Sequence, residues 1–599
     1  MFRRRLGSAV CAAALLAGLC AAGPARADDP RAVVQGVEDD ALRRLIERQI
    51  GETEHPPQSR FEARRRANDA AERAVTVLRS EGYYAYEVST EVEGSGDNLR
   101  PVVIVNPGPR FSIAAPQISW ANETPTPDAA RKAAEAMGLA APATPGRAAE
   151  VVAAEGRILA SLQAEGYADA VAQPREVVVD HADRTVRPTF RIDVHSVVRL
   201  DGLRLQGRTK TTQAWVRRLA PWKEGDEYEP EDVAELERRL LDTGVYQSVT
   251  VALAPNNERG LRPIVVSLAD RPGATLELGA SYATEEGAAV NGRYTIYNRL
   301  GRADTVTFGA QLGEILNRID AQLALPHWRQ PQETLRLTAL AYQDDTKAYR
   351  EQDVGLRVEL QKRLGRNAYR TYGVAVDLSD NDEPRFVNGE FVVVERKLAT
   401  LTGIAARTLD RTDNTFDPTR GWKLDVRAEP TAVTGDDSLV FLKAVAQGTA
   451  YFAFDDKART VIAGRLRLGS ILGGGIPQVQ SARRFYAGGG SSVRGYGYQD
   501  VGPRFPDEEQ TPVGGLSLVE TSLEVRHRFT DRWGAVAFVD AGTVGNETYP
   551  DFDDLSVGVG VGARYHLSFA PIRVDVAVPL NKREGDAAFQ LYVSIGQAF

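Results

Sequence analysis

The second half of the sequence alternates apolar and polar residues at every other position. In residues 556–566 the odd-numbered positions carry Val, Ala or Tyr, whereas the even-numbered ones carry Ser, Gly, Arg or His. Residues 572–578 and 589–595 repeat this pattern. A period of two is that of a β-strand whose two faces meet different surroundings. From about Gly273 onward such segments are separated by Gly, Asp and Asn turns, which predicts an all-β fold for residues 273–599.

The polar faces of these strands indicate what kind of all-β fold to expect. Arg573 and Asp575 share one face, and an arginine facing the middle of a bilayer would cost about 2–4 kcal/mol. We therefore expect them to point into the lumen of a closed barrel whose apolar face meets lipid. A membrane-crossing strand takes roughly 9–11 residues and, with its turn, about 20, which predicts about 16 antiparallel strands. Soluble β-sandwiches also alternate, but this segment would need several of them.

The N-terminus resembles a cleavable secretory signal. Arginines at positions 3–5 precede an apolar run that ends in Ala25-Arg26-Ala27, which predicts a signal peptide over residues 1–27. Both cysteines, Cys11 and Cys20, lie inside it. The mature chain would then hold no thiol, which excludes a disulfide scaffold and a cysteine nucleophile. A free exported protein is the plainest alternative at this point.

Charge and motif content argue against several classes of function. The net charge is −8, and removal of the signal, which holds four arginines and no acid, makes it more negative, so no nucleic-acid partner is expected. The six histidines are scattered without an H-E-x-x-H pair. Neither G-x-S-x-G nor G-x-x-x-x-G-K-[ST] occurs. We predict that the protein is not an enzyme and has no metal site and no cofactor.

The first half of the sequence repeats itself. Three helical stretches end in Gly followed by an aromatic residue, at 81–84, 165–167 and 243–246, roughly 80 residues apart. A Gly after a helix supplies the left-handed turn that ends it. Each unit reads strand, helix, helix, strand, strand, so three βααββ modules are predicted.

The most distinctive stretch, residues 482–503, reads A-R-R-F-Y-A-G-G-G-S-S-V-R-G-Y-G-Y-Q-D-V-G-P. Five glycines between 488 and 497 permit a tight excursion with Arg494 as the charge at its tip. By spacing alone this is a glycine-rich surface loop. However, F-Y-A-G-G at 485–489 followed by S-V-R-G-Y at 492–496 resembles the inward-folded loop of the BamA/TamA family of outer-membrane assembly factors.

Three further segments and the repeats extend this resemblance over nearly the whole mature chain. D-R-T-D-N-T-F-D-P-T-R-G at 410–421 resembles the family's mid-barrel hairpin, residues 514–524 resemble the strand after the loop, and F-V-D-A-G at 538–542 resembles the next strand. The repeats resemble POTRA domains, and their number favours the TamA branch. The implied organisation is a signal peptide (1–27), three POTRA-like modules (30–109, 110–194, 195–272) and an outer-membrane barrel (273–599) with its inward loop at about 470–512.

The resemblance also implies a site. The loop motif is Val493, Arg494, Gly495 and Tyr496, and its partners on the lumen wall are Glu524, Phe538, Asp540 and Gly542. A planar guanidinium can bind a carboxylate through two parallel hydrogen bonds and stack on an aromatic ring. We therefore expect Arg494 to pair with Asp540 or Glu524 and to lie on Phe538.

A second implied site is the seam between the first strand, near 274–282, and the last, 589–599. Unpaired backbone groups there would accept an incoming strand. Gly596 permits a kink, although an ordinary strand glycine is an alternative. Phe599, with apolar residues at alternate positions before it, resembles the C-terminal signal by which barrel proteins are recognised for assembly.

The function implied is the insertion or translocation of β-barrel proteins, such as autotransporters, by strand addition at this seam. The expected partners are unfolded outer-membrane β-barrel proteins, an inner-membrane-anchored TamB-like protein at the POTRA region, and outer-membrane lipid. The location would be a Gram-negative-type outer membrane, with the repeats in the periplasm. A two-partner secretion transporter, a passive porin and a direct role in lipid handling are the alternatives.

Overall fold

The computed structural model describes residues 29–599 except 54, 140, 142–143, 256–260, 285, 366, 388–389, 551, 553, 568–569 and 596. The predicted signal peptide lies outside the described residues. The chain forms two compact units. One runs to Arg199 and includes Asp226–Pro230, and the other holds most of the third repeat together with the barrel.

The first repeat is a three-stranded sheet with two helices. The sheet order is β2–β5–β4, with β2 parallel to β5 and β4 antiparallel to it. The Asp39 carboxylate caps α1 by accepting hydrogen bonds from the backbone N–H groups of Ala41 and Leu42. The elements are β1 (Asp29–Pro30), β2 (Val33–Gln35), α1 (Asp40–Ile50), β3 (Glu52–Thr53), α2 (Arg60–Ser80), β4 (Glu87–Glu93), η1 (Gly96–Asn98) and β5 (Arg100–Asn106).

The second repeat follows the same order of elements. Its sheet centres on β9, which pairs with β6, β7 and β8. Helix α3 has Thr126 as its N-cap and Gly138 in the left-handed conformation at its end. The elements are β6 (Ser112–Ile113), β7 (Gln117–Trp120), α3 (Pro127–Met137), α4 (Ala148–Ala164), β8 (Val171–Asp180) and β9 (Thr185–Asp193).

The third repeat has the sheet order β10–β12–β11. Its elements are β10 (Arg199–Arg208), α5 (Gln213–Leu219), α6 (Pro230–Leu241), β11 (Tyr246–Leu253) and β12 (Leu261–Asp270). The prediction of three βααββ modules ahead of an all-β segment is confirmed. The limits proposed for each module stay predictions. None of the helices in the described part of the chain is long and apolar enough to cross a membrane.

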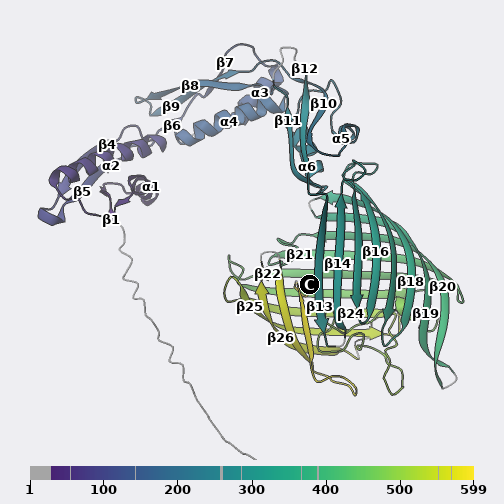
Figure 1. The fold of residues 1–599 in the computed structure, drawn as a ribbon. Helices are drawn as coiled ribbons and strands as arrows, with labels where there is room; N and C mark the ends of the chain where they lie inside the picture. The colour runs from purple at the N-terminus through teal and green to yellow at the C-terminus, as the bar shows by residue number, and fades with distance from the viewer. Residues whose placement is uncertain are drawn as a thin grey trace, which may run out of the picture. The chain divides into compact units, whose positions relative to one another are not determined.

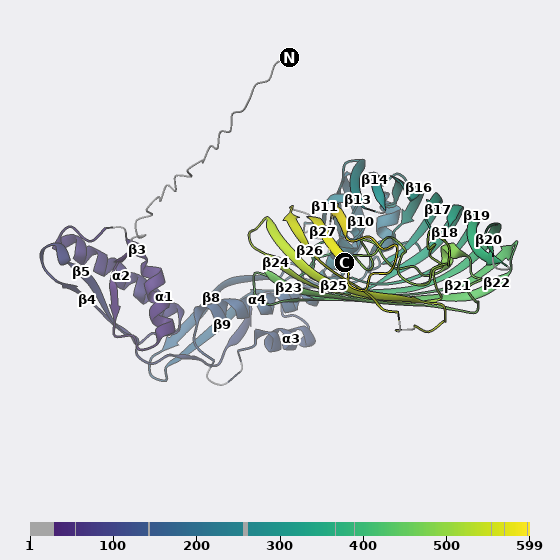
Figure 2. The same ribbon diagram turned by 90° about the horizontal axis from the view of Figure 1, so that it is seen from below.

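The barrel is a closed sheet of 16 antiparallel strands, as the sequence predicts, and its strands follow one another round the wall (Figures 1 and 2). The strands are β13 (Ala274–Ala283), β14 (Gly287–Tyr297), β15 (Thr305–Gly313), β16 (Leu316–Leu325), β17 (Glu333–Asp345), β18 (Arg350–Gly365), β19 (Ala368–Val387), β20 (Glu390–Asp410), β21 (Gly421–Gly435), β22 (Leu439–Ala453), β23 (Thr460–Leu472), β24 (Ser517–Arg528), β25 (Trp533–Gly545), β26 (Ser556–His566), β27 (Pro571–Pro579) and β28 (Gln590–Ile595).

The two faces of the wall differ as the alternation predicts. On β27, Arg573 and Asp575 are buried, whereas Val574 and Val576 are each about two-fifths exposed on the outer surface. Val561 of β26 is 64% exposed, and Arg564 of the same strand is 1% exposed. An apolar exterior around a charged interior is the arrangement of a barrel surrounded by lipid.

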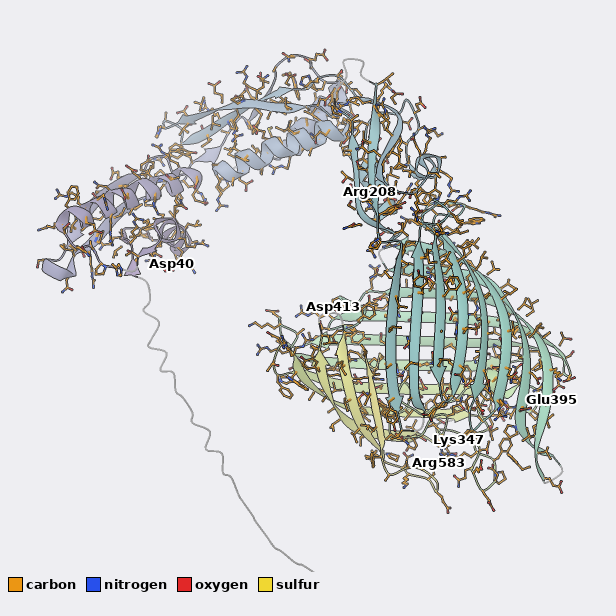
Figure 3. All side chains as sticks on the ribbon, viewed as in Figure 1. Asp40, Arg208, Lys347, Glu395, Asp413 and Arg583 are labelled. Carbon is orange, nitrogen blue, oxygen red and sulfur yellow. The ribbon has the colours of Figure 1, made fainter. Side chains whose placement is uncertain are left out.

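The barrel has a near end, where β13 follows the third repeat, and a far end. Figure 3 marks both: Arg208 and Asp413 lie toward the near end, and Lys347 and Arg583 lie toward the far end. At the near end the turns between strands contact the third repeat. Arg218 of α5 donates hydrogen bonds to the carbonyl oxygens of His327 and Trp328, in the turn between β16 and β17.

The His327 ring fastens this turn through both of its nitrogens. Nε2 lies 3.0 Å from the carbonyl oxygen of Arg239 at the end of α6, and Nδ1 accepts a hydrogen bond from the Gln332 backbone N–H at 2.8 Å. A neutral ring with its proton on Nε2 satisfies both contacts. A second proton on Nδ1 would face the Gln332 N–H. Burial lowers the pKa of His327 below its usual 6.5.

Acidification is expected to loosen this contact. Because the pKa of His327 is lower in the folded state than in the unfolded state, its contribution to stability is present above pH 6.5 and is lost as the pH falls through the lowered value. Hydrogen-exchange protection of residues 326–332, corrected for the intrinsic rate, should fall over that range. His327→Gln, which does not titrate, should remove the pH dependence, and an unchanged pH profile in this variant would contradict the assignment.

Candidate functional site

The long loop between β23 and β24, residues 473–516, folds into the barrel. Val493 and Tyr496 at its tip are buried, in one apolar cluster with Leu398 and Phe441 of the wall. Within the loop, Phe485 exchanges backbone hydrogen bonds with Gly515. These contacts hold the glycine-rich segment against the inner face of the wall.

Arg494 is the centre of the site and is only 2% exposed. Its Nε and Nη2 donate to the two carboxylate oxygens of Asp540 at 2.6 and 2.9 Å, and its backbone N–H also donates to Asp540 at 3.1 Å. Nη1 lies 2.7 Å from Glu524 Oε1. The guanidinium carbon is 3.4 Å from the centre of the Phe538 ring. The structure thus brings Arg494, Glu524, Phe538 and Asp540 together.

One further carboxylate completes the surroundings of Arg494. Asp575 of β27 lies 3.4 Å from Nη1 and is also paired with Arg564 of β26. The sequence placed Asp575 in the lumen but did not indicate it as a partner of the loop. Arg494 therefore links the loop to three strands of the wall, β24, β25 and β27. A fully buried cation surrounded by carboxylates contributes little net energy by itself, but it fixes the position of the loop, because leaving it unpaired would be costly.

Glycines on the lumen face of the wall make room for the loop. A Cβ added at Gly558 of β26 would overlap the carbonyl oxygen of Arg494, and one at Gly542 of β25 would lie 2.7 Å from Val493 Cγ2. Gly560 leaves space for the Phe538 ring in the same way. Gly495 has a φ of +102°, which a residue with a side chain rarely adopts. The wall and the loop are thus complementary in shape as well as in charge.

A second anchor, which the sequence did not indicate, holds the base of the loop. The Ser481 N–H donates to Glu383 Oε1 of β19 at 2.9 Å, and Gln480 donates to Glu351 of β18 at 3.3 Å. Arg483 lies 3.6 Å from Asp377 of β19. Glu351, Asp377 and Glu383 fall on the lumen face by alternation, so that face was predictable. Which loop residues meet these carboxylates depends on the path of the loop and was not.

The mid-barrel hairpin predicted at residues 410–421 joins β20 to β21 at the near end of the barrel (Figure 3). Asp417 accepts a hydrogen bond from Arg528 at 2.8 Å and another from Gln597 at 2.9 Å, and it lies 3.4 Å from His566. Burial alone would raise the pKa of Asp417, but its bonds to His566 and Gln597 and the charge of Arg528 hold that pKa at about 2. The hairpin thereby joins the middle of the barrel to its last strands.

The seam between β13 and β28 has the shortest register in the described part of the wall. Tyr282 pairs with Val593 and Ala283 with Tyr592, whereas β13 and β14 are in register along all ten residues of β13. The last strand ends at Ile595, earlier than the predicted 599. Gly596 lies outside the described residues.

Phe599 does not continue the apolar face of the last strand. Its ring lies 5.3 Å from the guanidinium carbon of Arg526 and 5.7 Å from that of Arg465, both of which face the lumen, and Arg526 donates to its backbone oxygen. These contacts place Phe599 beside arginines of the lumen. The role of Phe599 as an assembly signal stays a prediction.

No group of three or more potential ligand side chains that could hold a metal ion occurs among the residues that the structure describes. The side chains of the interior instead form a network of arginines and carboxylates, which holds the loop in place by ion pairs and hydrogen bonds.

Removal of the central cation is expected to free the loop. Arg494→Ala leaves Asp540 buried without its cation and leaves Glu524 with Arg526 alone, which should cost about 3–5 kcal/mol of stability. Thermal unfolding and heat-modifiable migration in gels measure this loss. Arg318→Ala is the matched control, because Arg318 is 41% exposed and pairs with Asp320 at 3.1 Å, where a loss below about 1 kcal/mol is expected. Equal behaviour of the two variants would contradict the site.

The glycine opposite the loop backbone offers an independent test. Gly558→Ala should push the Arg494 segment away from β26, at a cost of about 1–3 kcal/mol for overpacking. Gly448→Ala on β22 is the control, since a Cβ there would meet nothing within 4 Å. Protease cleavage within residues 485–500 should increase only in Gly558→Ala; increased cleavage in both variants would show a general loosening of the barrel.

Comparison with family models matches residues 298–599 to the Omp85 superfamily domain and residues 198–269 to the surface antigen variable number repeat, or POTRA. The outer membrane protein assembly factor BamA of Nitratidesulfovibrio vulgaris is 24% identical over 467 residues, which cover 76% of this chain and 58% of that protein. BamA of Neorickettsia risticii is 23% identical over 430 residues, which cover 68% and 56%. The chain thus spans somewhat more than half the length of these relatives.

The crystal structure of BamA from Haemophilus ducreyi lacking POTRA domains 1–3 has a similar fold, with a TM-score of 0.69 and 18% identity over 81% of this chain and all of that one. The resemblance seen in the sequence is confirmed at the level of the family, whereas the closer likeness to TamA stays a prediction. The prediction that the chain is not an enzyme agrees with this family. With its Omp85 domain covering half of the sequence, the chain belongs to the Omp85 superfamily, as an outer-membrane β-barrel with periplasmic POTRA repeats.

Proposed function

We propose that the protein inserts other β-barrel proteins into the outer membrane by adding their strands at its own seam. The observation that carries this proposal is the short pairing of β13 with β28, which involves two residues of each strand in the described part of the seam. Among the residues that the structure describes, 274–281 of β13 have no registered partner on β28. Backbone groups without partners are costly in hydrocarbon, by several kcal/mol each, so this edge favours the arrival of another strand.

By strand addition, such an edge assists the insertion of a client without any covalent bond being made or broken. An incoming strand supplies hydrogen bonds to the side of β13 that faces the seam, and its apolar side chains meet lipid beside Leu276 and Leu278, which are 64% and 77% exposed. Successive strands of the client then pair with each other. The names of the BamA relatives, outer membrane protein assembly factors, support this task.

The POTRA repeats offer edges for the same kind of pairing before the membrane is reached. Strand β8 is an edge of the second sheet, pairs only with β9 and carries exposed Val171 and Val178. Strand β4 is an edge of the first sheet. We propose that these edges hold unfolded β-barrel clients through backbone hydrogen bonds, which require little of the client sequence.

The finer assignment concerns clients and partners. The three repeats support a TamA-like task, in which autotransporters are clients and an inner-membrane-anchored TamB-like protein binds the POTRA region. A passive porin is less suitable, because the loop anchored by Arg494 occupies the lumen that a diffusion pore would need.

A disulfide across the seam tests the proposal. The mature chain is predicted to lack cysteine, so Tyr282→Cys with Val593→Cys places the only thiol pair at facing positions of β13 and β28. Oxidation should stop insertion of a barrel client into vesicles that contain the purified protein, and a reductant should restore it. The measurement is the fraction of client that becomes folded and protease-resistant.

The matched control places the same bond away from the seam. Val290→Cys with Leu312→Cys joins facing positions of β14 and β15, which stay paired in any opening of the seam. Oxidation of this pair should leave insertion unchanged. Full activity of the oxidised seam variant would refute strand addition at this site.

A further inference from the structure

The tip of the inward loop binds the first hairpin of the barrel. The backbone N–H of Gly490 donates to Glu286 Oε1 at 3.1 Å. Glu286 lies in the turn between β13 and β14, at the far end of the seam. The fit is close, because a Cβ added at Gly489 would lie 2.9 Å from the same carboxylate oxygen. The loop therefore touches the β13 side of the seam through a glycine that has no room for a side chain.

The same tip also binds the other side of the seam. The Tyr592 hydroxyl of β28 accepts a hydrogen bond from the Gly495 N–H at 3.2 Å and donates to the Tyr496 carbonyl at 3.3 Å. Arg573 of β27 donates to the carbonyl oxygen of Gly490 at 3.4 Å. A Cβ added at Gly490 would lie 2.8 Å from the Tyr592 ring.

Both sides of the seam and the loop enclose one space. A cavity of about 350 Å³ lies behind the seam and is lined by Glu286, Gly490, Tyr498, Arg573 and Tyr592. Its lining joins residues of β13–β14, of the loop and of β27–β28. The paired residues Tyr282 and Ala283 thus lie outside the contacts by which the loop connects the two sides of the seam. We call these contacts the bridge.

We propose that the loop tip is a clasp for the seam, in which Glu286 and Tyr592 are positioning residues that hold β13 and β28 together through residues 490–496. This inference rests on the proposed function in taking the seam as the working site, and it adds how that site is kept closed. In the described part of the seam β13 and β28 are in register over two residues each, so their pairing alone is weak. A loop that is itself fixed to β24, β25 and β27 by Arg494 gives them a rigid support.

The clasp predicts faster opening of the seam when either contact is removed. In the purified full-length protein in nanodiscs, hydrogen exchange is measured at the amides of Thr284 and Leu591, which bond across the seam to the Leu591 carbonyl and the Thr284 hydroxyl. The rate of exchange reports the opening equilibrium even when the open state is rare. Glu286→Ala and Tyr592→Phe should each raise it by about tenfold, the scale of one hydrogen bond to a charged or well-packed group.

Matched variants separate the clasp from a general loosening. Glu314→Ala removes a bond to the Ala288 N–H of 3.0 Å, in the next turn but on one side of the seam only, and should leave seam exchange unchanged. Glu286→Gln keeps an acceptor oxygen and should retain most of the protection. Because either break opens the same bridge, Glu286→Ala with Tyr592→Phe should raise the rate less than the product of the two single effects.

Exchange at the seam and insertion of clients are separate measurements, so the two proposals can fail separately. Unchanged exchange at Thr284 and Leu591 in both Glu286→Ala and Tyr592→Phe would overturn the clasp, whatever the insertion activity. Multiplicative effects of the two substitutions would overturn it as well, because they would show two independent contacts. A seam that opens faster in Glu286→Ala while client insertion does not change supports the clasp and counts against strand addition at the seam.

Discussion

Every backbone N–H and C=O group in the hydrocarbon layer needs a partner inside the protein, and this requirement shapes the whole barrel. In the described residues, the other strand junctions meet it with antiparallel registers of six pairs, between β27 and β28, to twenty pairs, between β19 and β20. The junction of β13 with β28 has two registered pairs among the described residues. The junction with the shortest register is therefore where the sheet is most open to pairing with another strand.

The interior of the barrel has a different role, because it holds a loop of more than forty residues in a fixed position. On an exposed surface, ion pairs between charged side chains contribute little to stability. Buried behind the wall, Arg494 and its three carboxylates impose a specific geometry, because any displacement leaves a charge unpaired. The glycines at 542 and 558 let the loop come close enough for that geometry to form.

Sequence reasoning predicted what depends on local pattern and missed what depends on the path of the chain. The alternation with a period of two predicted a strand at residues 556–566, where β26 lies. The resemblance of the loop motif led us to expect Arg494 beside Asp540, and the two side chains are hydrogen-bonded in the structure. The Ala-rich helix α3 carries few large apolar residues to mark its face and was not located, although Thr126 and Gly138 mark its ends. The contacts of Asp575, Arg483 and Phe599 join segments far apart in sequence, so no local spacing reports them.

The distribution of anchors suggests why the loop is bound in two places of different character. Its base is held by Glu351 and Glu383 on β18 and β19, strands with long registers that do not need to move. At its tip, residues 490 and 495 are bound by Glu286, Arg573 and Tyr592, which lie in or next to the strands of the seam. If both anchors lay on the rigid side of the barrel, the seam would have no internal support, and if both lay at the seam, each opening would release the loop entirely. With one anchor on each, the tip can leave Glu286 while the base keeps the loop inside, so the bridge can form again when the seam closes.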